Sequence, residues 1–388
     1  MILITTLTFG GAETQAVRLA TEFKQRGWEV CVVCMIDPVA YVDQLREKGI
    51  CVHSLAMRRG VPDLGAVSRL RNLIAAFQPA IVHSHMFHAN ILGRVTRLFC
   101  EIPKLICSVH NLRETSERGG PTWYKELLYR ATDRLADKTT IICNAAFERY
   151  VKVGAVPENK LQVIPNGVDM DVFSSSAEQK ELARHELGLK TEFVWLAVGR
   201  MVKQKNYPSL FDALEQLGTG EFTLLLVGGG PLESELRARC DHAFLKERVR
   251  FCGTHENVLQ FYRAADGFVM SSEFEGLSVA LLEAAAMGLP AVVTDVGGNA
   301  DVVIDGLTGY VVPPNNPAQL ALAMRRVMDA PAERHKLFSE RARRYAYDHF
   351  RFPAIVEKWL SLYRELPSEA RLPEKSEADA SVDLAVVK

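Results

Sequence analysis

Short apolar runs alternate with helical patterns along most of this 388-residue chain. Such alternation indicates parallel sheets joined by crossover helices. In the first half the predicted strands are 2–6, 29–35, 51–55, 80–83, 104–109, 140–143 and 162–164, and the helices include 13–25, 64–77 and 89–98. In the second half the predicted strands are 193–198, 222–227, 249–252, 267–270, 291–294 and 309–311, and the helices include 207–217, 232–240 and 279–287. The sequence therefore predicts an α/β fold of two doubly wound, Rossmann-like domains that face each other across a cleft.

The break between the two series falls after Asn166-Gly167-Val168-Asp169. We expect a first domain at 1–172, a second at 173–345, and a helix within 346–366 that packs back on the first domain. Residues 367–388 are rich in Pro, Ser, Glu and Asp, which is typical of a disordered tail. In doubly wound sheets ligands bind beyond the carboxyl ends of the strands, so the cleft between the domains is the expected site.

The composition is that of an ordinary soluble protein, with 48% hydrophobic residues, 24% charged residues and a net charge of -1. This balance gives no indication of a nucleic-acid partner. Residues 1–172 carry 21 Lys+Arg against 17 Asp+Glu (+4), and the remainder carries 25 against 30 (-5). The difference fits either an anionic partner on the first domain or chance surface variation. No apolar run reaches the ~18–20 residues of a membrane span, and no signal peptide is recognisable, so we expect a cytoplasmic protein.

The cysteines and histidines do not form a recognisable metal motif. Cys31 and Cys34 lie inside an apolar strand pattern and have no second pair of ligands nearby. His83, His85 and His88 follow a predicted strand, where they line an acceptor pocket or bind a metal, but no neighbouring acidic residue completes a metal site. We therefore predict neither a metal ion nor another cofactor.

Two carboxylates flank the turn Gly276-Leu277-Ser278: Glu275 precedes it and Glu283 lies in an apolar helix pattern after it. A buried carboxylate without a partner is costly, so something must meet Glu283. A hydroxyl-rich ligand is one candidate. The alternative is that one carboxylate caps the helix and the other is a buried structural group.

Loops that follow predicted strands contain glycines and basic side chains. Arg200 and Lys205 follow the first strand of the second domain, where they would either bind a diphosphate or form a solvated basic loop. Gly10-Gly11 and Gly228-Gly229-Gly230 each join a strand to a helix, which suits either phosphate contact or a tight turn. His110 ends a strand and faces the cleft, where it can bind a sugar hydroxyl or serve structure alone. The dinucleotide fingerprint is missing, which argues against an NAD-linked dehydrogenase.

Taken in order, these segments resemble the family 4 retaining glycosyltransferases, which have the GT-B fold. The resemblance spans roughly residues 2–345 and is carried by Gly10-Gly11-Ala12-Glu13, Ser108-Val109-His110, 164–169, Gly199-Arg200 with Lys205, Gly228-Gly229-Gly230-Pro231, and Glu275 with Glu283. One departure is Asp301, where the family commonly has Glu, so its role is open.

The resemblance implies a role for each of these residues. Arg200 and Lys205 would hold the donor diphosphate, and Glu283 would accept hydrogen bonds from the ribose hydroxyls. Glu275 would contact the transferred sugar, helped by the N–H groups of Gly276, Leu277 and Ser278. Gly11 would let the first domain approach the phosphate, and His110 would orient the sugar. The family needs no metal and retains the anomeric configuration, which favours attack on the same face as the departing group.

Within the family, Met86-Phe87-His88-Ala89-Asn90 and Glu275-Gly276-Leu277-Ser278 look like enzymes of capsule, exopolysaccharide or lipopolysaccharide synthesis. The expected donor is a UDP-sugar, or next a GDP-sugar, and the expected acceptor is a glycan or a polyprenyl-diphosphate-linked sugar. Peripheral contact with an anionic membrane is predicted for Arg94, Arg97, Lys104, Arg113, Arg118, Lys125 and Arg130, with Trp123, Tyr124 and Tyr129. The alternatives are a nucleotide-sugar epimerase of the same fold and a non-catalytic nucleotide-sugar scaffold.

Overall fold

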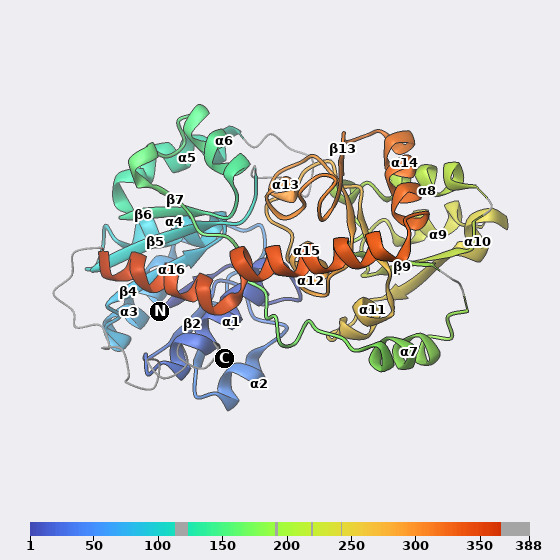
Figure 1. Ribbon diagram of the computed structural model, residues 1–388. Coiled ribbons are helices and arrows are strands. Elements are labelled where there is room, and N and C mark those ends of the chain that lie inside the picture. Colours follow the sequence, from blue (N-terminus) through green and yellow to red (C-terminus); the bar gives the residue numbers. More distant parts are fainter. Residues whose placement is uncertain (113–122, 191–192, 219, 242, 366–388) are drawn as a thin grey trace.

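The computed structural model describes residues 1–112, 123–190, 193–218, 220–241 and 243–365. These residues form two α/β domains that lie side by side (Figure 1). The first contains a seven-stranded sheet of order β3-β2-β1-β4-β5-β6-β7, and the second contains a six-stranded sheet of order β10-β9-β8-β11-β12-β13. Neighbouring strands pair in parallel, as in β1 with β4 and β8 with β11. The predicted fold class is confirmed.

In the first domain strands and helices alternate along the chain. Its elements are β1 (Ile2–Ile4), α1 (Gly11–Gln25), β2 (Cys31–Cys34), α2 (Val42–Glu47), β3 (Cys51–Ser54), α3 (Gly65–Phe77), β4 (Ile81–His85), α4 (Phe87–Thr96), β5 (Lys104–Val109), α5 (Trp123–Thr132), η1 (Asp133–Leu135), β6 (Lys138–Ile141), α6 (Asn144–Lys152), η2 (Glu158–Lys160) and β7 (Leu161–Val163).

The second domain repeats the scheme and ends in three successive helices. Its elements are α7 (Ala177–Glu186), β8 (Phe193–Val198), η3 (Lys203–Lys205), α8 (Tyr207–Leu217), β9 (Phe222–Val227), α9 (Glu233–Arg239), α10 (Ala243–Arg248), β10 (Val249–Gly253), α11 (Leu259–Ala264), β11 (Gly267–Met270), α12 (Val279–Ala286), β12 (Ala291–Thr294), α13 (Asn299–Val302), β13 (Gly309–Val312), α14 (Pro317–Met328), α15 (Ala332–Phe350) and α16 (Phe352–Glu365).

Strands β5, β8, β9, β11 and β12 have the predicted bounds, and the other strands are displaced at one or both ends. Strand β6 ends before Cys143, which is buried but has extended backbone at the start of α6. Strand β4 continues to His85, beyond the predicted end, because its polar side chains are buried against one another. The apolar pattern therefore fails in opposite ways at these two ends, since Cys143 is apolar and buried without strand pairing, whereas the polar end of β4 is both buried and paired.

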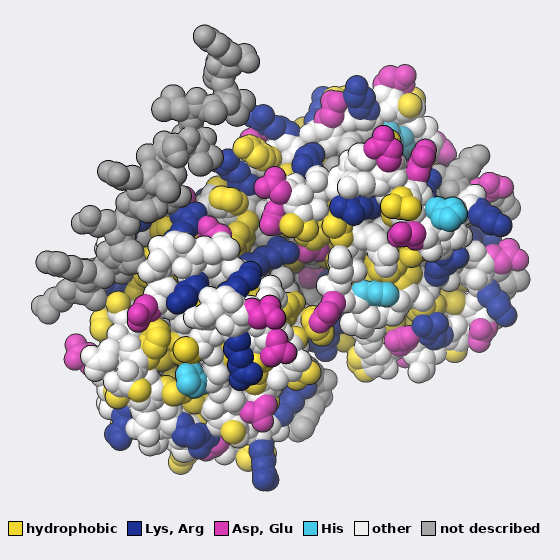
Figure 2. All heavy atoms as spheres, turned by 90° about the horizontal axis from the view of Figure 1, so that it is seen from below, with side chains coloured by type: hydrophobic (Ala, Val, Ile, Leu, Met, Phe, Trp, Pro, Cys, Tyr) yellow, Lys and Arg dark blue, Asp and Glu magenta, His cyan; other side chains and the backbone are white. Residues whose placement is uncertain are grey.

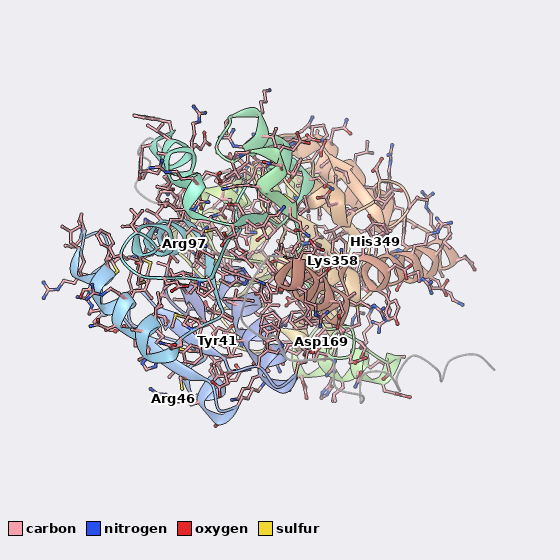
Figure 3. The ribbon with its side chains drawn as sticks, turned by 90° about the vertical axis from the view of Figure 1, so that its left-hand side faces the viewer. Tyr41, Arg46, Arg97, Asp169, His349 and Lys358 are labelled. Carbon is pink, nitrogen blue, oxygen red and sulfur yellow. The ribbon has the colours of Figure 1, made fainter. Side chains whose placement is uncertain are left out.

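The chain passes between the domains twice, and the two passages are hydrogen-bonded to each other. The N–H of Val168 donates to the carbonyl of Phe350 (2.8 Å), and the N–H of Phe352 donates to the carbonyl of Val168 (2.9 Å). A Cβ at Gly167 would lie 2.8 Å from Cδ2 and 3.0 Å from the Cα of Phe352, so a larger residue here would press on α16. Figure 3 marks this region with Asp169 on the first passage and His349 near the second.

Helix α16 carries the end of the described chain back to the first domain. Figure 1 shows α15 and α16, in orange to red, running from the second domain across to the first. Val356 and Trp359 of α16 join the core that contains Ile2 and Phe23. The helix predicted within 346–366 begins at Phe352, because α15 extends to Phe350. The predicted tail at 367–388 lies outside the described residues.

The predicted basic surface on the first domain is wrong in part. Arg94, Lys104, Lys125 and Tyr129 are buried. Arg94 donates to the carbonyl of Tyr129 (3.0 Å), and Lys104 donates to the carbonyl of Tyr363 (2.7 Å). These cations are satisfied inside the protein, so they cannot face a membrane. Arg113 and Arg118 lie outside the described residues.

Candidate active site

The residues singled out in the sequence lie where the two domains face each other. In the space-filling view the domains are two lobes that meet at a waist, where charged side chains of both signs gather (Figure 2). Asn166 of the first domain donates from Nδ2 to the carbonyl of Leu277 in the second (3.0 Å). A Cβ at Gly276 would lie 2.4 Å from the carbonyl oxygen of His110, so only glycine permits this approach. The two domains are therefore in direct contact at the candidate site.

Lys205 and Glu275 form a short, partly buried ion pair at the carboxyl end of the second sheet. Lys205 Nζ lies 2.6 Å from Glu275 Oε1, which also accepts a hydrogen bond from Ser272 Oγ at 2.6 Å. The two residues follow β8 and β11, which are neighbouring strands. The sequence predicted both residues in the site but did not predict their bond. Lys205 has three N–H donors, so it can hold Glu275 and still bind a diphosphate.

The turn between Glu275 and α12 is held in one conformation by close backbone contacts. The N–H of Gly298 donates to the carbonyl of Gly276 (2.7 Å), and a Cβ at Gly297 would lie 2.0 Å from the carbonyl oxygen of Glu275. Ser278 is the N-cap of α12 and accepts from the N–H of Leu281 (3.4 Å). The N–H groups of the turn thus stand at the start of a helix, where an anion is favoured.

Glu283 is met by two protein groups, one from each domain. Tyr262 donates its hydroxyl to Glu283 Oε2 (3.0 Å), and Arg18 of α1 lies with one guanidinium nitrogen 3.8 Å from Glu283 Oε1. Burial raises the pKa of Glu283 to about 7, although Arg18 and Tyr262 oppose that shift. The sequence analysis expected a partner for Glu283 and proposed a ligand. Tyr262 and Arg18 are partners that it did not find.

His110 is part of a cluster of three imidazoles at the carboxyl ends of β4 and β5. Its Nε2 lies 3.0 Å from Nδ1 of His85, whose ring packs 4.0 Å from the ring of His83. Burial lowers the pKa of His110 to about 4, so the ring is neutral at physiological pH. Of the three histidines that the sequence analysis grouped together, His83 and His85 therefore lie behind His110 and support it. The third, His88, is not part of this cluster, and burial and then the positive charge of Lys125 lower its pKa.

The loop after β1 faces the second domain. A Cβ at Gly11 would lie 3.2 Å from Cγ2 of Val279, so a larger residue here would press on α12. Burial raises the pKa of Glu13, and a hydrogen bond from Thr8 (3.1 Å) and the positive charge of Arg200 oppose that shift. Arg200 is exposed and acts electrostatically on this loop from the other side of the cleft.

The second glycine-rich loop serves a tight turn. Gly228 has a φ of +131°, and a Cβ there would lie 2.1 Å from the carbonyl oxygen of Gly199. A Cβ at Gly230 would lie 2.6 Å from the carbonyl oxygen of Met201. Backbone packing against the Arg200 loop therefore accounts for these two glycines. The sequence left two interpretations of this loop, phosphate contact or a tight turn, and the tight turn alone explains the two glycines.

A hollow of about 660 Å³ lies on the first domain at the opposite, amino end of its sheet. It is lined by residues from α5, η1, α6 and the segment before η2, including Ala131 and Val156. None of the candidate site residues borders it. Within the described ranges, no group of three or more His, Cys, Asp and Glu side chains is arranged to hold a metal ion.

Comparison with known proteins identifies the class to which this fold and site belong. Residues 9–172 match the family model for glycosyltransferase family 4, and residues 179–345 match the model for glycosyl transferases group 1. The chain belongs to the family 4 glycosyltransferases. The boundary between the two matches lies in the segment that joins the domains.

Two relatives that match most of the chain are named as glycosyltransferases. The chain is 28% identical over 316 residues to UDP-Gal:alpha-D-GlcNAc-diphosphoundecaprenol alpha-1,3-galactosyltransferase of Escherichia coli, covering 79% of this chain and 80% of that protein. It is 30% identical to D-inositol 3-phosphate glycosyltransferase of Nocardiopsis dassonvillei, covering 76% and 72%. The fold matches Anabaena HepE, solved with UDP and glucose, with a TM-score of 0.81 at 21% identity, covering 94% and 99%.

Proposed function

We propose that the protein is a retaining glycosyltransferase that takes a sugar from a nucleotide diphosphate sugar, a UDP-sugar in the first instance. The acceptor is a glycan or a sugar linked to polyprenyl diphosphate, and the pathway is cell-surface polysaccharide synthesis. The observation that carries this proposal is the bond between Lys205 and Glu275 at the carboxyl end of the second sheet, just before the helix that carries Glu283. The backbone carbonyl of His110, in the first domain, lies against the turn at Gly276 that follows Glu275.

In the proposed donor site the positively charged groups lie where the diphosphate would bind, and a carboxylate lies where the ribose would bind. Arg200 and Lys205 are the cations for the diphosphate, and the start of α12 adds backbone N–H groups. Glu283 lies 8 residues after Glu275, and its carboxylate accepts hydrogen bonds from ribose hydroxyls. Binding of the ribose would compete with Arg18 for Glu283 Oε1, so donor binding is coupled to the contact between the domains.

The reaction follows from stabilisation of the leaving group. As the bond from the sugar to the diphosphate breaks, negative charge grows on the diphosphate, and preorganised cations and N–H donors stabilise it. The acceptor hydroxyl attacks on the same face, and the departing phosphate oxygen takes its proton. Glu275, held by Lys205 and Ser272, positions the sugar. The cations of the protein supply the positive charge in this scheme, so it calls for no metal ion.

The first test is calorimetric titration of the purified protein with UDP and with GDP, in buffer that contains a chelator. We expect UDP to bind and GDP to bind more weakly. Stronger binding of GDP would correct the donor class, and binding of neither nucleotide would contradict the proposed donor site. The E283Q variant is the matched control, because it keeps the shape of the side chain but loses the carboxylate.

The acceptor is proposed from the relative in Escherichia coli, which acts on GlcNAc linked to diphosphoundecaprenol. A synthetic N-acetylglucosaminyl diphospholipid is therefore the first acceptor to assay, with UDP-galactose and UDP-glucose as donors. Transfer with retention at the anomeric carbon supports the proposal. Nucleotide binding without transfer to any lipid-linked or free glycan favours the non-catalytic scaffold, and interconversion of the donor alone favours the epimerase.

We further propose that the first domain touches an anionic membrane through α5. Trp123, Tyr124, Leu127 and Leu128 form an exposed apolar strip on this helix. Arg130 and Arg134 are exposed next to it, and this combination suits the membrane interface. In the described ranges no helix combines the length and apolar character that a membrane span demands, so the proposed contact is peripheral.

A further inference from the structure

Tyr262 has a hydroxyl in contact with Glu283, and the proposed reaction does not use it. The residue lies in α11, just before strand β11, and its side chain is fully buried. Its hydroxyl oxygen lies 3.0 Å from Glu283 Oε2 and 3.0 Å from the backbone carbonyl oxygen of Ala280. Both acceptors belong to α12. The hydroxyl therefore contacts this helix at two points, and one of them is the carboxylate proposed for the ribose.

The ring of Tyr262 is held by aromatic packing on two sides. Phe173, in the segment that joins the domains, meets it edge to face with the ring centroids 5.6 Å apart. Phe268 of β11 lies 6.4 Å away, and its ring is inclined by 14° to that of Tyr262. Close packing of this kind in a core leaves a ring little freedom to turn. The core of the second domain and the joining segment therefore fix the position of the hydroxyl.

The hydroxyl of Tyr262 is the donor in this contact. Burial, together with the negative charge of Glu283, raises the pKa of Tyr262 well above its usual value, so the phenol keeps its proton. The hydroxyl has one proton to give to two acceptors. An ionised carboxylate accepts a stronger hydrogen bond than a neutral carbonyl does. Tyr262 therefore donates to Oε2 when Glu283 is ionised, although the carbonyl of Ala280 alone would satisfy a purely structural hydroxyl.

The two oxygens of Glu283 face different neighbours. Oε2 faces Tyr262 inside the second domain, whereas Oε1 faces Arg18 of the first domain at 3.8 Å. That distance is longer than the ~2.7–2.9 Å of a direct hydrogen bond between a cation and a carboxylate, so Oε1 can accept from another donor. The side chain of Glu283 is 10% exposed, so it is not fully closed off from solvent. The bond from Tyr262 thus fixes the carboxylate with one oxygen turned inward and the other turned toward the first domain.

We infer that Tyr262 is a positioning residue of the donor site, whose hydroxyl holds Glu283 so that Oε1 accepts a hydrogen bond from a ribose hydroxyl. The inference rests on the proposed function, in which Glu283 binds the ribose. Tyr262 acts through Glu283 and contacts neither the nucleotide nor the sugar. Without the hydroxyl, both carboxylate oxygens can turn toward Arg18, and the ribose must then compete with a closer ion pair. The loss should therefore appear in recognition of the ribose and not in the chemical step.

The Y262F variant separates the hydroxyl from the packing, because it keeps the aromatic ring. The matched control is Y310F, since the hydroxyl of Tyr310 lies in the same domain but accepts from Arg334 of α15 (3.0 Å). The ligands are UDP and 2′,3′-dideoxy-UDP, which differ only in the two ribose hydroxyls. Calorimetric titration at pH 8, above the pKa of about 7 of Glu283, gives the ratio of their dissociation constants for each protein. The dideoxy nucleotide detects general damage to the site.

The ratio should depend on the hydroxyl of Tyr262. Wild-type protein should bind UDP at least ~10-fold more tightly than the dideoxy nucleotide, because hydrogen bonds to a charged group are strong. Y262F should reduce this ratio ~5-fold by weakening UDP alone, and Y310F should leave it unchanged. E283Q should lower the ratio as well, and Y262F should have no further effect in the double variant, since both act on one contact. In the transfer assay Y262F should raise KM for the donor without lowering kcat.

Equal weakening of UDP and of the dideoxy nucleotide in Y262F would show that Tyr262 only packs, and it would overturn the inference. A wild-type ratio in Y262F would do the same. A lower kcat with an unchanged KM would also contradict it, because the hydroxyl would then act in the chemical step. If wild-type protein does not bind UDP, the proposed function fails and the inference falls with it. If wild-type protein binds UDP and Y262F keeps the full ratio, only the inference is wrong.

Discussion

Arg18 and Glu283 form an ion pair that joins the two domains, with 3.8 Å between a guanidinium nitrogen and Oε1. Burial raises the pKa of Glu283 from 4.5 to about 7, in spite of Arg18. A raised pKa means that the folded protein binds the proton more tightly than the unfolded chain. The contribution of the protonated group is fully present below pH 4.5 and is lost as pH rises toward 7.

E283Q should therefore become more stable relative to the wild-type protein as pH rises. Since one pKa unit corresponds to about 1.4 kcal/mol, the shift predicts a relative gain of about 3 kcal/mol between pH 4.5 and 8. Urea denaturation of both proteins at pH 5 and pH 8 measures it. E256Q, at an exposed carboxylate of the same domain, is the control. The prediction fails if the stability difference between E283Q and wild type is the same at both pH values.

Lys205 and Glu275 should be interdependent in both stability and catalysis. Removing one partner of a buried pair leaves an uncompensated charge, which typically costs 3–5 kcal/mol. Lys205→Ala and Glu275→Ala should each lower turnover at least ~100-fold through loss of a transition-state charge contact. The double variant should lose less free energy of unfolding than the sum of the losses in the two single variants. Near-normal transfer by either single variant would contradict the assigned roles, and circular dichroism checks that each variant is folded.

The strands could be predicted because their apolar runs are short and bounded by polar turns, as at Phe193–Val198 and Ala291–Thr294. Glu275 and Lys205 could be placed at the cleft, because residues after parallel strands meet at one edge. Their bond could not be predicted, since it depends on β8 and β11 being neighbours. Arg18 was missed because an arginine on an amphipathic helix looks like a solvated residue.

The predicted basic surface was wrong in part for the same reason, because burial of a charged side chain depends on contacts that only the fold creates. Charge in a sequence suggests exposure, but Arg94 is buried because carbonyl and hydroxyl oxygens of α5 and β6 surround its guanidinium. Those acceptors lie 35 and 45 residues away in the chain. Tyr262 was likewise missed, since its hydroxyl on α11 reaches Glu283 of α12 only in the folded protein. Contacts of this range need the fold before they can be inferred.

Asp301, whose role the sequence left open, should stabilise the contact between the domains. Its carboxylate accepts from the backbone N–H of Asn144 (3.0 Å) and from Asn144 Nδ2 (3.2 Å) at the start of α6. Loss of a capping carboxylate typically costs about 1 kcal/mol. D301A should lower the free energy of unfolding by that amount, measured by urea denaturation. D301N should lower it less, because its amide oxygen still accepts; an equal loss in both variants would show that the charge alone matters.

The apolar strip on α5 should bind vesicles that contain anionic lipid. Trp123 and Leu127 are 66% and 50% exposed, so W123S/L127S should weaken sedimentation with phosphatidylglycerol vesicles at least ~10-fold. L322S is the control, because Leu322 is 45% exposed on α14 of the second domain. Arg130 and Arg134 add an electrostatic part of about 1 kcal/mol each, so binding should fall as salt rises from 0.05 to 0.5 M. Binding that is absent, or that neither salt nor W123S/L127S alters, would refute the membrane contact.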